Sequence, residues 1–193
     1  MAIIKGVPFF EPVTLEEMKN HSRIDVGDDD LILTGLMKAA REYCETFTGR
    51  SLCSRVIVYI LNDWPSGGIY LPCPPVTEVL EVLYRPKDAA AFTNFNDFEE
   101  DDTGMFKRVV PTDRWPSGEL HPVNAIQVEY MAGYDTMANV PESIKSALRL
   151  VVGAWYENRE GVLPAGHIGR TLPMGVESLL WQERVFWTED LNK

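Results

Sequence analysis

The spacing of the apolar residues changes twice along this chain, and this change restricts the fold more than any other feature. Residues 28–49, DDDLILTGLMKAAREYCETFTG, carry apolar side chains at helical spacing, and residues 141–161 do so again. Between them, short segments rich in β-branched and aromatic residues alternate with proline and glycine, which is typical of strands joined by turns. The chain therefore has to combine helices with strands.

Capping residues predict where the first two helices begin. Thr14 stands three residues before Glu17, the spacing of a capping box, and predicts a helix that runs to about residues 23–24. The acid cluster that follows suits the positive end of a helix dipole, so residues 28–29 are expected to cap a second helix. Gly49 is expected to end that helix, as a glycine just past the last turn often does.

The C-terminal part predicts two more helices. Pro141 fits the first turn of a long helix, and Gly161 is expected to end it. After a glycine- and proline-containing loop, residues 176–185, VESLLWQERV, predict a short helix, and a polar tail follows.

We therefore expect an α+β protein with a mainly helical core and a small inserted antiparallel β region. Two N-terminal helices, the long C-terminal helix and the short helix make the core. Residues 1–53 and 135–193 are expected to form this helical core, and residues 54–134 the β-rich insertion. A chain of 193 residues can bury enough apolar surface to hold such a fold without disulfides or metals.

Composition excludes several classes of protein. The net charge of −11 argues against a protein that grips nucleic acid, because such proteins need basic surface to displace counterions from phosphate. No apolar run approaches the length of a membrane span, and the N-terminal residues lack the apolar region of a signal peptide. Cys44, Cys53 and Cys73 show no metal-site spacing and are expected to be reduced thiols, so we expect a protein made and kept in a cytoplasm.

Motifs that would indicate catalysis or metal binding are missing from the sequence. Asp25 and residues 28–30 could attract a cation, but they lack the spacing of a calcium loop, and helix capping explains them better. His21, His121 and His167 form no metal-binding or nucleophile–base pair, and no phosphate-binding loop is present. We therefore expect no catalytic residue, no metal and no cofactor.

Aromatic residues near the end of the long helix predict packing and assembly instead. Trp155 and Tyr156 are expected to anchor this helix against the second helix around Tyr43 and Phe47. Arg159 is expected to meet an acid of another helix or of a neighbouring chain, because on its own helix Glu157, two residues away, points to a different side.

A second group of aromatic residues could contact a partner. They lie before an acidic run and near the C-terminal end of the chain: Phe92, Phe95, Phe98, Trp181, Phe186 and Trp187. Two interpretations stay open for the first three, which either face the core in part or form a partner contact. The aromatic tail is expected to dock, either onto the protein's own body or onto a partner, and we predict that residues after Leu180 extend toward another molecule.

Seven sequence blocks, taken in order, resemble a known family. They are PVTLEEMKNHSRIDVGDDDLI, followed by AAREYCETFTGRSL, and then YLPCPPVTEV, IQVEYMAGY, VPESIKSAL, WYENREG and LPMGVESLL. Together they resemble the phage gp6-like head–tail connector family, also described as phiE125 gp8-like, from about Pro12 to Leu180. No single block is a catalytic signature, so the resemblance depends on their ordered combination.

The resemblance implies a structural protein that forms a homo-oligomeric ring, of about twelve copies in relatives. Such a ring stacks on the portal protein, lets DNA pass without specific binding, and offers a docking surface to a tail or stopper protein. It implies a place at the head–tail junction of a virion, synthesis in the cytoplasm of a bacterial host, and no membrane partner. Two alternatives stay open from the residues alone: an enzyme or accessory factor of the DNA-packaging module, and a β-rich protein-binding module.

Overall fold

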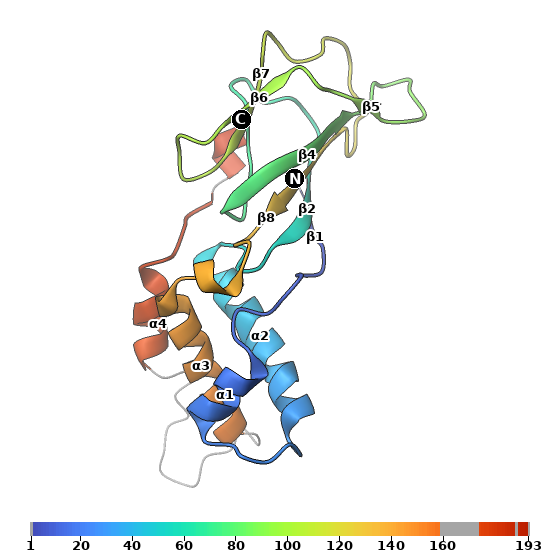
Figure 1. The fold of residues 1–193 in the computed structure, drawn as a ribbon. Coiled ribbons are helices and arrows are strands. Elements are labelled where there is room, and N and C mark those ends of the chain that lie inside the picture. The colour runs from blue at the N-terminus through green and yellow to red at the C-terminus, as the bar shows by residue number, and fades with distance from the viewer. Residues whose placement is uncertain (1, 159–173, 188, 193) are drawn as a thin grey trace, which may run out of the picture. The chain divides into compact units, whose positions relative to one another are not determined.

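The chain folds into two compact units (Figure 1), and the computed structural model describes residues 2–158, 174–187 and 189–192. Each unit is assembled from segments that are distant in the sequence. The helical unit consists of Phe10–Thr48 and Asp135–Val185, and the sheet unit consists of Met1–Phe9, Gly49–Tyr134 and Phe186–Lys193.

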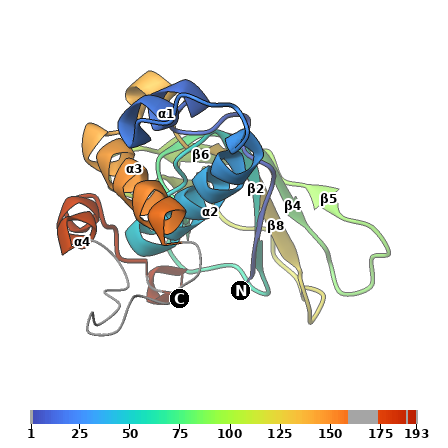
Figure 2. The ribbon, with the colours of Figure 1, turned by 90° about the horizontal axis from the view of Figure 1, so that it is seen from below.

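The described residues of the helical unit form four α-helices and one 3₁₀ turn. They are α1 (Leu15–Ser22), α2 (Asp30–Thr48), η1 (Met137–Asn139), α3 (Glu142–Glu157) and α4 (Met174–Trp181). Seen from below, α3 lies between α2 and α4, and α1 covers one end of the α2–α3 pair (Figure 2). The four predicted helices are therefore confirmed, although the expected end of α3 at Gly161 lies outside the described residues.

The start of α1 follows the predicted capping box. The Thr14 side chain accepts a hydrogen bond from the Glu17 backbone N–H at 3.1 Å, and the Glu17 carboxylate accepts one from the Thr14 N–H at 2.8 Å. Arg23 then ends the helix in a left-handed conformation, with φ of 55°. Two orphan backbone donors at the start of the helix are thus satisfied locally.

The core of the helical unit is formed by the apolar stripes of its helices. Leu33, Met37 and Ala40 are buried on α2, at the spacing the sequence predicts. On α3 the buried apolar residues are Ile144, Ala147, Leu148, Val151 and Val152.

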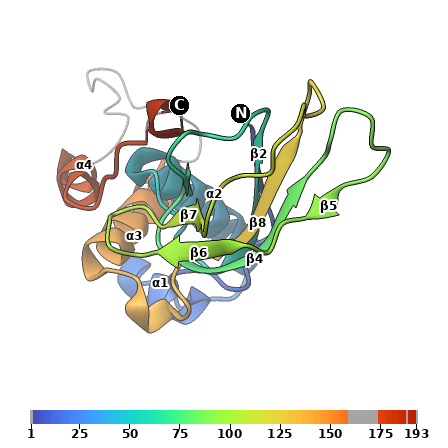
Figure 3. The ribbon, with the colours of Figure 1, turned by 90° about the horizontal axis from the view of Figure 1, so that it is seen from above.

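The described residues of the sheet unit form eight strands in two antiparallel sheets, and Figure 3 shows most of these strands from above. The five-stranded sheet has the order β1 (Ala2–Lys5), β2 (Arg55–Leu61), β8 (Ile126–Ala132), β4 (Val76–Tyr84) and β5 (Thr93–Asn94). The three-stranded sheet has the order β3 (Ile69–Tyr70), β7 (Arg108–Pro111) and β6 (Phe98–Asp101). A 3₁₀ turn, η2 (Glu189–Asn192), belongs to the same unit.

One hydrophobic core serves both sheets. Alternate residues of β8, namely Ile126, Val128 and Tyr130, are fully buried, as expected for a strand with one face on a core. They pack in the same cluster as Ile69 of β3 and Val109 of β7.

The expectation of a small inserted β region needs correction. The sheets are substantial, with five and three strands, and β1 belongs to them although it lies outside the expected insertion, residues 54–134. The sequence indicates β5 and β6 only weakly, because β5 has two residues and β6, FEED, carries charges that depress strand propensity. The α+β class itself is confirmed.

Candidate functional site

Aromatic side chains join α2 to α3 in the helical unit. The rings of Tyr43 and Trp155 meet edge to face, with centroids 6.3 Å apart, and Phe47 lies 6.3 Å from Tyr43 along the same helix. Trp155 is half-buried, so part of its indole stays at the surface. The structure thus brings Trp155 to Tyr43, as the sequence predicts, while the assembly role of these residues stays a prediction.

Tyr156 joins the same helices at a different point. Its hydroxyl donates a hydrogen bond to the carboxylate of Asp29, immediately before α2. The acid cluster before α2 also contains Asp30, which forms an ion pair with Lys19 of α1 at 2.8 Å. Arg159, the last candidate of this group, lies outside the described residues.

Trp181 lies on the surface of the helical unit beside the C-terminal end of α2. Its ring meets the ring of Phe47 at 6.2 Å, and the guanidinium of Arg184 lies over both rings, 4.9 Å and 5.1 Å from their centroids. Trp181 nevertheless keeps 58% of its surface exposed. We call Phe47, Trp181 and Arg184 the aromatic–arginine cluster.

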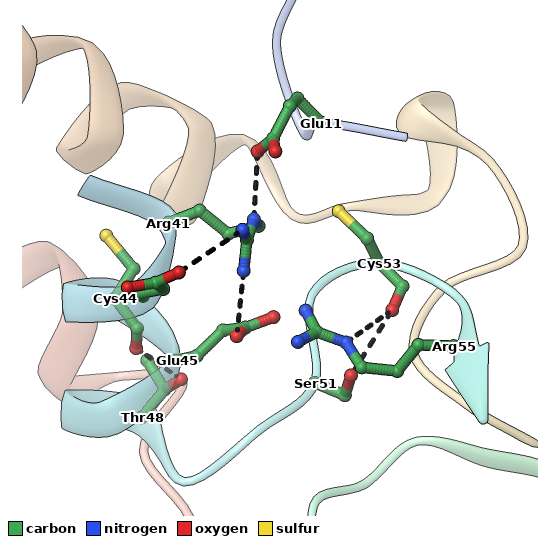
Figure 4. Close-up of polar contacts among 9 residues, drawn as sticks. Glu11, Arg41, Cys44, Glu45, Thr48, Ser51, Cys53 and Arg55 are labelled. Carbon is green, nitrogen blue, oxygen red and sulfur yellow. Dashed lines mark hydrogen bonds and ion pairs between the residues drawn. The ribbon is translucent and has the colours of Figure 1, made fainter. Parts of the chain in front are cut away.

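A buried cation lies on the other flank of α2, and Figure 4 shows its surroundings. Arg41 donates to Glu11 at 2.9 Å and to Glu45, one turn further along α2, at 3.3 Å. The side chains of Arg41 and Glu45 are 5% and 4% exposed, whereas Glu42, 3.7 Å from the guanidinium, is largely in solvent. Sequence analysis missed this network, although Arg41 and Glu45 stand four residues apart and flank the predicted apolar stripe.

Burial also suppresses ionisation on α2. Burial, with a smaller contribution from Glu45, raises the pKa of the Cys44 thiol to about 12, which keeps it neutral and unreactive. The pKa of Tyr43 is raised as well, first by burial and then by the nearby carboxylate of Glu177. Neither group is therefore prepared for nucleophilic or acid–base chemistry near neutral pH.

The aromatic residues of the 92–98 segment lie within the sheet unit in different environments. Phe95 is buried, and Phe98 packs against it with ring centroids 6.4 Å apart. Phe92 is half-buried, and the guanidinium of Arg85 lies 5.4 Å from its ring centroid. Of the two interpretations left open by the sequence, core packing describes Phe95 and Phe98.

The two Trp-Pro-Ser-Gly segments of the sequence meet in space. The indoles of Trp64 and Trp115 stack in parallel, with centroids 4.4 Å apart and planes inclined by 9°. Trp115 also donates from Nε1 to the backbone carbonyl of Pro65 at 2.9 Å. The identity of the two segments in the sequence was a signal that could have indicated a paired contact.

The C-terminal tail requires a further correction. We predicted that residues after Leu180 extend toward another molecule, but Val185 is buried in the helical unit and its N–H donates to Thr48 O at 2.7 Å. Trp187 packs edge to face on Tyr59 and Phe106 of the sheet unit, with centroids 6.1 Å and 5.1 Å apart. The tail docks because contact with Tyr59 and Phe106 removes apolar surface of the Trp187 ring from water.

Phe186 differs from its neighbours in the tail, because it is 65% exposed. It and Trp181 are the members of the second candidate group whose rings stay mainly at the surface. These two side chains remain candidates for partner contact.

The described residues contain no group of three or more histidine, cysteine or acidic side chains arranged to hold a metal ion. A hollow of about 670 Å³ on the sheet unit is lined by Tyr84, residues 94–97 and residues 112–117, which present mixed polar and aromatic groups. No described helix is both long and apolar enough to span a bilayer.

Comparison with known proteins identifies related folds. Residues 12–102 match the family described as phage gp6-like head-tail connector protein. Nearly the whole chain, 97%, matches 97% of a chain in the neck of an empty gene transfer agent particle computed with C6 symmetry, with a TM-score of 0.79 and 20% identity. A chain of the virion of a native gene transfer agent particle matches with a TM-score of 0.77 and 19% identity.

The native neck computed with C12 symmetry also contains a chain of this fold, with a TM-score of 0.72, 19% identity and coverage of 97% of both chains. No curated protein matches the sequence. The segment that matches the connector family holds α1, α2 and the strands from β2 to β6, and the later sequence blocks of the resemblance lie beyond it. Residues 12–102 of this chain thus match the phage gp6-like head–tail connector family, and nearly the whole chain shares its fold with chains of gene transfer agent particles.

Proposed function

We propose that this chain is a structural subunit of a head–tail connector ring in a phage, a prophage or a related particle. The ring stacks on the portal protein, extends the channel for DNA and presents a docking surface to a tail or stopper protein. The observation that carries the proposal is the family match of residues 12–102, together with the likeness of nearly the whole chain to a fold present in particle necks.

The two units take different parts in the proposed ring. The helical unit, with segments inside residues 1–53 and 135–193, makes the contacts between copies, and the β-rich residues 54–134 decorate the ring or meet the next component. Tyr43, Phe47, Trp155 and Tyr156 hold the helices in place for this task. The exposed face of the aromatic–arginine cluster is the surface we assign to a neighbouring copy, because a large aromatic side chain with 58% exposure is stabilised when a partner covers it.

Charge supports passage of DNA without specific binding. The chain carries a net charge of −11, and a channel lined by acids repels the phosphates of duplex DNA and lets it slide. Screening restricts the effect to charges within about 8 Å of the DNA at physiological salt, so only residues that line the channel contribute. The native particle neck computed with C12 symmetry supports about twelve copies. The subunit is made in the bacterial host cytoplasm and acts at the head–tail junction.

Electron microscopy and native mass spectrometry test the proposal. The purified chain is examined alone and after mixing with the portal protein of the same particle, and annular particles with one copy number are expected in the mixture. Duplex DNA at low salt should show no retention by these particles in a filter-binding assay. Absence of rings both alone and with the portal contradicts the proposal.

A pair of substitutions separates a specific contact between copies in the oligomeric ring from nonspecific hydrophobic adhesion. Trp181→Ser should reduce formation of the oligomeric ring, because it removes the exposed indole of the aromatic–arginine cluster. Met105→Ser is the matched control, since Met105 is exposed to a similar extent, 61%, but lies in the sheet unit. Equal ring formation by both variants removes Trp181 from the contact.

A further inference from the structure

Most edges of the two sheets are protected against the addition of another strand, each in a different way. The β1 edge is the least protected. At the β4 edge, the Val79 N–H donates to the Glu100 carboxylate at 3.4 Å. The ammonium of Lys107 donates to Thr77 O at 3.1 Å and to Glu100 at 2.6 Å. Side chains of the neighbouring sheet thus occupy backbone groups to which another strand could otherwise add.

The β3 edge is covered by the chain's own C-terminal segment. The Tyr70 N–H donates to the carboxamide oxygen of Asn192 at 2.7 Å, and the carboxamide nitrogen donates to Tyr70 O at 3.0 Å. One side chain therefore satisfies both backbone groups of Tyr70, as a paired residue of another strand would. Asn192 is buried and also donates to the Tyr59 hydroxyl at 3.0 Å.

The remaining edge strands are blunted by length or charge. β5 consists of Thr93 and Asn94 only, and both are exposed. β6 carries Glu99, Glu100 and Asp101 in four residues. Very short strands and charged residues are two devices by which proteins prevent unwanted strand addition.

β1 carries only one charge, that of Lys5, and no other described segment covers it. It is the outer strand of the five-stranded sheet, antiparallel to β2, with Ile4 opposite Val58. The hydrogen bond from Gly6 N to Val56 O, 2.8 Å, fixes the alternation, so Ile4 and Gly6 turn their backbone groups toward β2. Ile3 and Lys5 turn theirs outward, and no described residue forms a hydrogen bond to those outward groups.

The side chains along β1 and the residues after it are apolar and exposed. Ile3, Ile4, Val7 and Phe9 have 40%, 57%, 83% and 67% of their surface exposed. Ile3 and Ile4 point to opposite faces of the sheet, so a partner has to offer apolar groups on both faces. Lys5 is the one charge within the strand.

We propose that β1 binds an extended segment of a different neck polypeptide, which adds to the sheet as a sixth strand. This inference rests on the proposed function. The segment carries β-branched or other apolar residues on both faces and an acidic residue that meets Lys5. Strand addition gives affinity through the backbone groups of Ile3 and Lys5, and the isoleucines select the side chains.

A second copy of this chain is a poor occupant of the edge. The other described edges of such a copy are covered or blunted, as set out above, and offer no comparable strand. Pairing of β1 with β1 is two-fold and closes at two copies. The necks that contain this fold were computed with C6 and C12 symmetry, which cyclic head-to-tail contacts generate.

The test uses a short synthetic peptide of alternating valine and threonine with one glutamate. The control peptide has the same sequence with alternate backbone nitrogens methylated, so that it cannot donate backbone hydrogen bonds along that edge. Residue-resolved hydrogen exchange of the full chain should slow at the amides of Ile3 and Lys5 on addition of the first peptide. Ile4, whose amide already faces β2, should change little, and the methylated peptide should have no effect.

Substitutions at one position separate the backbone contact from hydrophobic adhesion. Ile3→Pro removes an outward donor, which an edge strand tolerates, and should weaken peptide binding by about fivefold to tenfold. Ile3→Val keeps the donor and the branched side chain and should bind like the parent chain. Thermal unfolding of both variants shows whether the sheet is intact.

Each outcome decides the inference. Equal binding of the methylated peptide, unchanged exchange at Ile3 and Lys5 at saturating peptide, or unweakened binding by a folded Ile3→Pro chain overturns it. Concentration-dependent protection of these amides in the chain alone assigns the edge to a second copy and also overturns it.

In assembled necks the two amides should be protected, and in isolated rings they should not. Failure of the parent chain to form rings contradicts the proposed function, whereas the peptide result is read on the free chain.

Discussion

Arg41 of the helical unit and Lys107 of the sheet unit are both buried cations, but their charges are neutralised differently. Arg41 shares its guanidinium between Glu45, which is as buried as Arg41 itself, and Glu11, which is 23% exposed. Lys107 is 8% exposed, yet its acids Glu100 and Asp102 are 32% and 70% exposed. Burial alone would lower the pKa of Lys107, but these two acids raise it. The partners of Lys107 can thus turn to water, and Glu45 cannot.

This difference teaches that the cost of losing a buried ion pair depends on the group left behind. A carboxylate that can rehydrate loses only the net value of the interaction. A carboxylate held in the interior retains its desolvation penalty without the compensating charge. The same kind of substitution should therefore have unequal effects at Arg41 and at Lys107.

Arg41→Met is expected to have the largest effect. It should lower the free energy of unfolding by ~3–5 kcal/mol, because Glu11 and Glu45 lose the charge they share. Urea denaturation measures the change, and Arg149→Met is a matched control, since its partner Glu142 is 72% exposed. If the two variants lose the same stability, burial of the partner acid does not govern the cost.

Trp155→Ala should have the second largest effect on stability. A fully buried tryptophan costs more, but Trp155 is half-buried, so a loss of ~2–3 kcal/mol is expected. Equilibrium unfolding followed by Tyr and Trp fluorescence checks this value. A loss below about 1 kcal/mol means that the contact with Tyr43 contributes little to the isolated chain.

Lys107→Met should cost less than Arg41→Met, about 1–2 kcal/mol, because Glu100 can rehydrate while the hydrogen bond to Thr77 is lost. The control is Lys87→Met, whose exposed ion pair with Glu119 should contribute less than about 1 kcal/mol. Chemical denaturation of both variants provides the comparison. A Lys107 variant as unstable as the Arg41 variant breaks the contrast between the units.

Acid pH should produce the smallest effect, at the β6–β7 pair. Hydrogen bonds from Thr103, and then the guanidinium of Arg108, lower the pKa of Asp101 to about 2 from its ordinary 3.8. The stability it contributes is present above about pH 4 and is lost as the pH falls toward 2. Asp101→Asn should flatten the pH dependence of amide exchange at Arg108 and Val109, and an unchanged slope rejects this assignment.

Local features of the fold were predictable and long-range ones were not. Thr14 and Glu17 lie within one helical turn, so their spacing alone predicts the start of α1. β1 is formed by pairing with β2, more than fifty residues away, and its AIIK sequence is a weak signal without that partner. Likewise nothing near Asn192 in the sequence indicates its bonds to Tyr70.

The candidate site residues show the same difference between local features, which were predictable, and long-range ones, which were not. The Trp155–Tyr43 contact follows from two helices whose stripes the sequence shows, because helical periodicity identifies which face is buried. The Arg41 network was missed because a charged residue beside an apolar stripe is normally assigned to solvent. Its acid Glu11 comes from thirty residues earlier, which no local pattern connects to it.

The chain passes between the two units four times, after residues 9, 48, 134 and 185. The helical unit therefore has all its segments only after residue 185 has been translated, and the sheet unit only after Asn192, which bonds to Tyr70, has been translated. A chain truncated before residue 135 lacks a segment of each unit, so neither core can be completed from it.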